Sequence, residues 1–144
     1  MRTANDEDPA ADTALIAQAH AILAPIDRNR QIIRLRTAGV SDHDIAARLA
    51  LTPAVVDRVA HREPDILTRP PSPLEVIARH VLGQVSHDEL MDDLLARRYT
   101  AGYVPDGSYD GWVRGTWSEL EIASATRMLS STDFAQLVHL APDA

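Results

Sequence analysis

Two closely spaced helix-start signals constrain the fold of this chain more than any other feature of its sequence. Ser41 precedes Asp44 by three residues, which is a variant of the capping box and predicts the start of a helix. Thr52 precedes Pro53, and proline favours the first position of a helix because an N–H there would have no partner. Residues 50–51 remain between the two predicted helices. The sequence therefore predicts two short helices joined by a tight turn.

Each of these two predicted helices has an apolar face. Ile45 and Leu49 lie four residues apart on the first helix, and Ala46 is small enough to let the helices cross closely. Val56 and Val59 are expected to face the core from the second helix. The opposite, solvent-facing side of the second helix then carries Ala54, Asp57, Arg58, His61 and Arg62.

Residues 30–62 are similar to the helix-turn-helix of response-regulator output domains and of sigma-factor region 4. The shared features are a helix that ends in Ala-Gly, then V-S and I-A-x-x-L, then a short turn and a capped second helix. The similar stretch covers about a quarter of the chain. It departs from the usual pattern at Ala50, where glycine is commonest, and at Asp57, which makes the second helix less basic.

This resemblance implies that the second helix enters the major groove of double-stranded DNA. The residues then expected to contact bases are Thr52, Ala54, Asp57, Arg58, His61 and Arg62. Two alternatives stay open. The same motif can bind a protein, and two helices of an ordinary bundle can match the pattern by chance.

Charge is spread unevenly along the chain, whose formal net charge is −7. Residues 27–70 hold eight Arg against six acidic residues, whereas residues 1–26 have a net charge of −3 and residues 71–144 one of −6. The basic excess coincides with the predicted DNA-binding motif, as contact with phosphates requires. The residues expected to contact phosphates are Arg28, Arg30, Arg34, Arg36 and Arg48.

Several chemistries lack the residues that they need. The chain has no Cys, which excludes disulfides and thiolate metal sites, and all 14 basic residues are Arg, which excludes lysine-dependent phosphate loops and Schiff bases. Residues 106–111 match the first half of a calcium-binding loop, but Trp117 occupies the position of its essential glutamate. We expect no catalytic residue, no metal and no cofactor, and no enzymatic activity. The acidic N-terminus and the lack of a long apolar run predict a cytoplasmic protein without a membrane segment.

The first half of the chain is expected to contain two more helices, at residues 12–23 and 27–37, separated by Pro25 because proline interrupts helices. The whole chain is then divided by composition into four regions. These are an acidic disordered tail at residues 1–11, a helix-turn-helix domain at 12–62, a proline-rich linker at 63–71 and an acidic helical domain at 72–141.

Helix-start signals recur in the acidic domain. Capping-box patterns begin at Ser72, Ser86, Thr116 and Ser130 and predict two helical hairpins. The four helices are expected at residues 73–83, 87–98, 117–128 and 131–140. The segment between the hairpins is rich in glycine and in aromatic residues, which concentrate at binding surfaces or else fill the gap between hairpins. The residues expected to bind a partner are Tyr103, Tyr109, Trp112 and Arg114.

The sequence thus predicts an all-α protein, with an N-terminal helix-turn-helix bundle and a C-terminal domain of two helical hairpins joined by an aromatic, Gly-rich loop. The expected function is that of a sequence-specific DNA-binding transcriptional regulator of bacterial or phage type. Its C-terminal domain would supply dimerisation, effector sensing or partner binding. The alternative is an antitoxin or inhibitor that neutralises a protein partner through the C-terminal domain and binds DNA for autoregulation.

Overall fold

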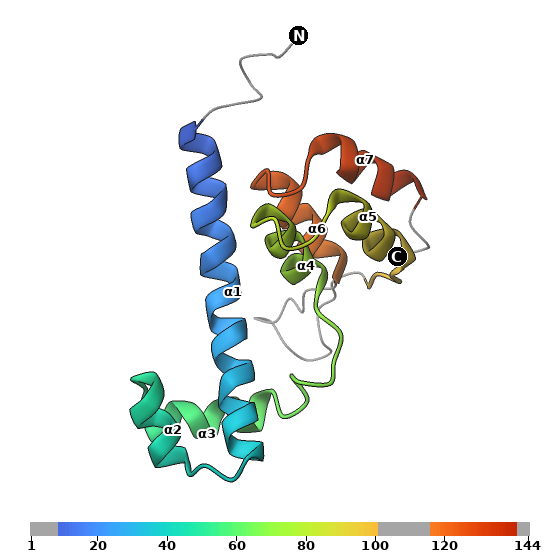
Figure 1. The fold of residues 1–144 in the computed structure, drawn as a ribbon. Coiled ribbons are helices and arrows are strands. Elements are labelled where there is room, and N and C mark those ends of the chain that lie inside the picture. Colours follow the sequence, from blue (N-terminus) through green and yellow to red (C-terminus); the bar gives the residue numbers. More distant parts are fainter. Residues whose placement is uncertain (1–8, 101–115, 141–144) are drawn as a thin grey trace, which may run out of the picture. The chain divides into compact units, whose positions relative to one another are not determined.

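The computed structural model describes residues 9–100 and 116–140. Within these ranges the chain forms seven α-helices and no strand, so the all-α prediction is confirmed (Figure 1). The helices are α1 (Pro9–Thr37), α2 (Asp42–Leu49), α3 (Pro53–Arg62), α4 (Pro73–Val81), α5 (His87–Ala96), α6 (Thr116–Ala125) and α7 (Ser131–Leu140). None of these described helices is both long enough and apolar enough to cross a membrane.

Helix α1 is continuous, so the prediction of two helices separated at Pro25 is wrong. A proline inside a helix removes one backbone hydrogen bond and costs about 3 kcal/mol. The surrounding residues contain no glycine and are rich in Ala and Arg, which favour the helix and offset that cost. The helix also begins at Pro9, so residues 9–11, expected to belong to a disordered tail, are helical.

The described helices fall into two compact units. The three-helix unit comprises residues 22–70, which include the end of α1 together with α2 and α3. The four-helix unit comprises α4 to α7, and residues 9–21 group with it.

The core of the three-helix unit joins all of its helices. Its buried members come from α1, α2, α3 and the segment that follows, and they are Ile32, Ile33, Ile45, Ala46, Val56, Val59 and Ile66. Val56 and Val59 are buried as predicted, and Ala46 is only 2% exposed, in keeping with a close crossing of α2. Fully burying one of the large aliphatic side chains contributes about 1.5–3 kcal/mol, so this cluster is the main stabilising feature of the unit.

Residues 63–69, predicted as the first part of a linker, form turns that pack onto the three-helix unit. The N–H of Ile66 donates to the carbonyl of Glu63 at 3.2 Å, and the N–H of Arg69 donates to the carbonyl of Asp65 at 3.0 Å. Ile66 is 2% exposed and belongs to the core. The prolines of this segment prevent a helix, but they do not prevent a turn that buries one isoleucine.

The predicted turn between α2 and α3 is present, together with both caps. The hydroxyl of Ser41 accepts a hydrogen bond from the N–H of Asp44 at 3.2 Å, and that of Thr52 accepts one from Val55 at 3.3 Å. Ala50 adopts a left-handed conformation, with φ 56° and ψ 44°, which explains why glycine is commonest at this position. These local interactions fix where α3 begins.

In the four-helix unit, three of the four predicted caps form. Ser72, Ser86 and Ser130 accept hydrogen bonds from the N–H groups three residues later, at 3.1–3.2 Å. The hydroxyl of Thr116 instead accepts from the N–H of Thr100 at 2.9 Å, while the N–H of Thr116 donates to the hydroxyl of Thr100 at 3.0 Å. The helices α4, α5 and α6 end two or three residues earlier than predicted.

The packing of the four-helix unit involves each of its helices. Helix α4 contacts α5 and α6, and α7 also contacts α5 and α6. Ile77, Leu90, Leu120 and Leu137 supply one core residue from each helix and are at most 1% exposed. The arrangement as two hairpins joined by an aromatic loop stays a prediction, because residues 101–115 lie outside the described ranges.

Candidate nucleic-acid interface

Helix α3 and its N-cap, Thr52, carry the six residues that were predicted to contact bases. Its inner face is fixed by the buried Val56 and Val59. Since α3 is ten residues long, the side chains turned away from these two valines face solvent. All six predicted residues are exposed, namely Thr52, Ala54, Asp57, Arg58, His61 and Arg62.

The exposed ionisable residues of α3 divide into two groups. Asp57 and His61 pair with each other, because the ring Nδ1 of His61 lies 2.8 Å from the backbone oxygen of Asp57 and 3.4 Å from its Oδ1. Arg58 and Arg62 lie beside a surface hollow that also involves α1. Asp57 thus contacts His61, and Arg58 forms no ion pair with a described carboxylate.

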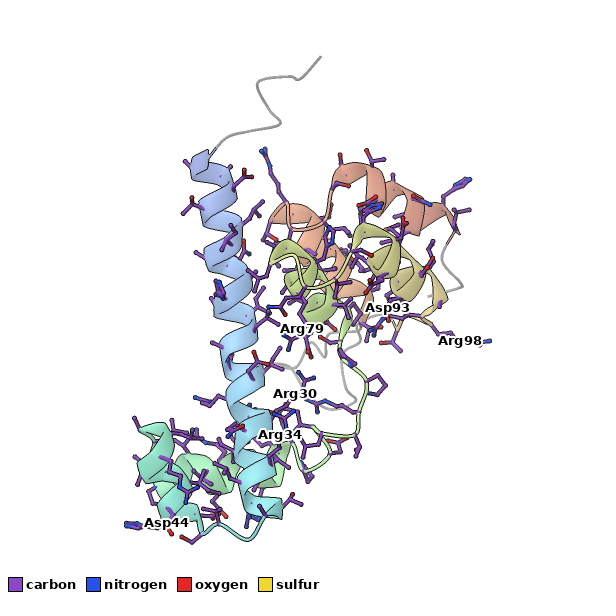
Figure 2. The ribbon with its side chains drawn as sticks, in the orientation of Figure 1. Arg30, Arg34, Asp44, Arg79, Asp93 and Arg98 are labelled. Atoms are coloured by element: carbon purple, nitrogen blue, oxygen red, sulfur yellow. The ribbon has the colours of Figure 1, made fainter. Side chains whose placement is uncertain are left out.

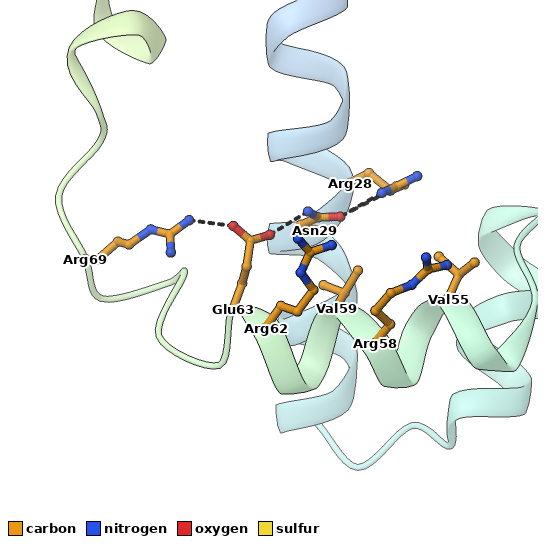
Figure 3. A pocket seen from close by; sticks show the side chains of 8 residues that line it. All are labelled: Arg28, Asn29, Val55, Arg58, Val59, Arg62, Glu63 and Arg69. Atoms are coloured by element: carbon orange, nitrogen blue, oxygen red, sulfur yellow. Dashed lines mark hydrogen bonds and ion pairs between the residues drawn. The ribbon is translucent and has the colours of Figure 1, made fainter. Parts of the chain in front are cut away.

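This hollow, called the arginine hollow below, has a volume of about 600 Å³ (Figure 3). Val55 and Val59 provide its apolar wall on α3. The polar residues that line it come from α1, from α3 and from the turns after α3, and they are Arg28, Asn29, Arg58, Arg62, Glu63 and Arg69. All of them belong to the three-helix unit.

A chain of hydrogen bonds crosses the arginine hollow. Nη2 of Arg69 donates to Oε1 of Glu63 at 2.7 Å, and Nδ2 of Asn29 donates to Oε2 of Glu63 at 2.6 Å. Oδ1 of Asn29 in turn accepts from Nε and Nη2 of Arg28, at 3.2 and 3.1 Å (Figure 3). Both carboxylate oxygens of Glu63 are thus bound, and the guanidinium of Arg28 is held by an uncharged partner.

The charges around the arginine hollow are unequal. Partial burial raises the pKa of Glu63, but hydrogen bonds from Arg69 and Asn29 and the positive charges of Arg69 and Arg62 outweigh burial, so the pKa is lowered overall. Nη1 of Arg69 also lies 3.6 Å from Oδ1 of Asp65. Among the described residues, no ion pair to a carboxylate is formed by Arg28, Arg58 or Arg62.

The other arginines that were predicted to contact phosphates differ in their surroundings. Nη1 of Arg30 lies 3.9 Å from Asp27, and Nε of Arg36 lies 3.6 Å from Asp42. Arg34, on α1, and Arg48, in the last turn of α2, are exposed and form no ion pair with a described carboxylate (Figure 2 labels Arg34). Arg34 and Arg48 therefore carry the freer charges of this set.

Three polar residues of the hollow were absent from the predicted site. Asn29 is uncharged and lies between Arg28 and Arg30, so the charge pattern does not indicate it. Glu63 and Arg69 fall in a segment whose prolines predict a linker. The one available signal is the apolar Ile66 between two prolines, which indicates that this segment packs against the protein.

Other predicted features lie outside the described residues. Tyr103, Tyr109, Trp112 and Arg114 fall in residues 101–115, outside the described ranges, as does the segment that partly matches a calcium loop. Among the described residues there is no group of three or more His, Asp or Glu side chains placed to hold a metal ion.

Comparisons with known proteins do not add a family. No protein-family model, no curated protein and no solved structure matches the chain. The function is therefore argued from the geometry of α3 and of its surroundings.

Proposed function

We propose that the protein is a sequence-specific transcriptional regulator that binds double-stranded DNA by inserting α3 into the major groove. The observation that carries this proposal is the way in which α3 is presented. Its inner face is buried at Val56 and Val59, its start is fixed by the cap at Thr52, and that cap and the five outward residues of α3 are all exposed. A helix presented in this way fits the major groove, which is about 12 Å wide.

The residues on α3 suit the recognition of base edges. Arg58 and Arg62 form no ion pair with a described carboxylate, and arginine binds the O6 and N7 atoms of guanine with two hydrogen bonds. Thr52, at the start of α3, and the paired Asp57 and His61 offer further donors and acceptors. We therefore propose that these residues read the sequence of the operator.

The distribution of charge also supports binding of DNA by the three-helix unit. The three-helix unit holds eight Arg against six acidic residues, whereas residues 71–144 have a net charge of −6. Phosphates attract the first region and repel the second. Arg34 and Arg48 are proposed to contact the backbone on either side of the groove. The four-helix unit is proposed to supply dimerisation, effector sensing or partner binding.

Selection of bound duplexes from a random DNA pool, at a stated salt concentration, tests this proposal. Arg58→Ala is expected to weaken binding of the selected sequence by about 1–3 kcal/mol, which is roughly five- to 150-fold, and to relax preference at one position. Arg98→Ala is the matched control, because Arg98 is exposed and projects from the chain just after α5 (Figure 2). If no sequence is enriched, or if both variants bind like the wild type, α3 is not a recognition helix.

A further inference from the structure

The arginine hollow has the size of a small-molecule site. Its volume of about 600 Å³ falls within the range of about 300–1,000 Å³ found for ligand pockets. It lies beside the proposed recognition face rather than on the opposite side of the unit, because Arg58 and Arg62 belong to both. A ligand in this hollow would therefore occupy side chains that the DNA also needs.

The lining of the hollow favours an anion with several charges. Arg28, Arg58 and Arg62 form no ion pair with a described carboxylate, so they supply three positive charges at one place. Planar guanidinium groups bind phosphate oxygens with two parallel hydrogen bonds. A DNA backbone phosphate carries a single negative charge, whereas two or three linked phosphates match the charge of three arginines.

The hydrogen-bond chain in the hollow reduces the repulsion that its one lining carboxylate would exert. Both oxygens of Glu63 are bound, one by Arg69 and one by Asn29. The same contacts orient the amide of Asn29, so that its oxygen faces the guanidinium of Arg28. Glu63 and Asn29 are thus positioning residues for Arg28.

We propose that the arginine hollow binds a small ligand of the oligophosphate class, and that this ligand and DNA exclude each other. The first half of the proposal concerns the hollow alone, and the second half rests on the proposed function. Because Arg58 and Arg62 serve both ligands, the oligophosphate lowers the affinity for DNA, and DNA lowers the affinity for the oligophosphate by the same factor. The protein then releases its operator when the ligand accumulates.

Calorimetric titration of the full-length protein with inorganic triphosphate, at constant ionic strength, tests the first half. One triphosphate per chain is expected to bind. Arg28→Gln is expected to weaken this binding about tenfold, since one charge-assisted hydrogen-bond partner is lost. Arg98→Gln, remote in sequence and outside the hollow, should bind like the wild type. No binding, or an equal loss in both variants, would overturn the site.

Displacement of the selected DNA tests the second half. Triphosphate should release labelled duplex from the wild type more strongly than sodium chloride of equal ionic strength, and this excess should shrink in Arg28→Gln. If triphosphate binds but releases DNA no better than sodium chloride does, the proposal that the two ligands exclude each other is wrong. If the protein binds no DNA at all, the proposed function fails, while the titration still decides whether the hollow is an oligophosphate site.

Discussion

Asn29 donates a hydrogen bond of 2.6 Å from Nδ2 to Oε2 of Glu63, and so joins the last third of α1 to the residue directly after α3 across 34 positions of sequence. This contact ties the C-terminal end of the proposed recognition helix to α1. The carboxylate receives a second hydrogen bond from Arg69, so three segments of the three-helix unit meet at one side chain.

Replacing Asn29 tests the contribution of this contact to stability. Asn29→Ala is expected to lower the free energy of unfolding by about 1 kcal/mol, because a half-exposed hydrogen bond to a carboxylate is lost while alanine favours the helix. Asn29→Asp should be more harmful, because it places a second carboxylate against Glu63. Urea denaturation of both variants measures the difference, and equal stability of all three proteins would contradict the role of this contact.

The lowered pKa of Glu63 predicts a loss of stability in acid. A carboxyl group whose pKa falls on folding stabilises the protein above its ordinary value of 4.5, and this contribution disappears as the pH falls through the lower folded pKa. The wild type should therefore lose more stability than Glu63→Gln between about pH 6 and pH 3. Urea midpoints across this range give the comparison, with Glu121→Gln, an exposed position on α6, as the control. Parallel curves for the wild type and Glu63→Gln would disprove the coupling.

The raised pKa of His87 predicts that the four-helix unit loses stability as the pH rises. Nε2 of His87 lies 3.0 Å from both carboxylate oxygens of Asp133, and this hydrogen bond and the charges of Asp133 and Asp88 raise the pKa of His87 above 6.5. The ion pair between the starts of α5 and α7 therefore stabilises the protein fully below pH 6.5 and is lost as the pH rises through the folded pKa. His87→Gln should remove this fall in stability, as seen in denaturation midpoints between about pH 5 and pH 8. An unchanged pH profile in that variant would assign the fall to another group.

Replacing Ala50, in the turn before α3, with glycine is expected to raise the free energy of unfolding. The left-handed conformation of Ala50, with φ 56°, costs an alanine about 1–2 kcal/mol, whereas glycine adopts it freely. Glycine also has more freedom in the unfolded chain, so Ala50→Gly should stabilise the protein by only about 0.5–1 kcal/mol. Thermal denaturation measures the change, and Ala47→Gly, inside α2, should be destabilising. A lower midpoint for Ala50→Gly would show that the alanine is not strained.

Arg34 and Arg48 predict how DNA binding depends on salt. Replacing both with Gln should weaken all sequences alike and reduce the slope of log affinity against log salt by roughly 1–2 units. Arg36→Gln should have a smaller effect, because the guanidinium of Arg36 already lies 3.6 Å from Asp42. Fluorescence anisotropy at several salt concentrations measures the slopes. A loss confined to one sequence would show that Arg34 or Arg48 reads bases.

Local signals were predictable from the sequence, and distant contacts were not. The caps at Ser41, Thr52, Ser72 and Ser86 depend on residues three positions apart, so the sequence pattern places those helix starts correctly. The helix break predicted at Pro25 is wrong because the free-energy cost of a proline is local, whereas the continuity of α1 depends on the stability of the whole helix. A local sequence pattern therefore does not predict whether a helix continues through a proline.

The candidate site shows the same limit. The exposed face of α3 follows from the 3.6-residue period of a helix. The arginine hollow does not, because Asn29, Glu63 and Arg69 come together only when the chain turns at residues 63–69 and buries Ile66. That turn depends on packing against a core whose other members lie up to 34 residues earlier in the chain.

The reciprocal hydrogen bonds between Thr100 and Thr116 have a consequence for protein engineering. They join Thr100 to Thr116, and the N–H of Trp117 adds a third bond, to the carbonyl of Thr100, at 3.1 Å. For a flexible segment, each doubling of length adds only about 0.6 kcal/mol to the entropic cost of bringing its ends together. A reporter peptide or an epitope inserted between Thr100 and Thr116 should therefore be carried by the four-helix unit at little expense in stability.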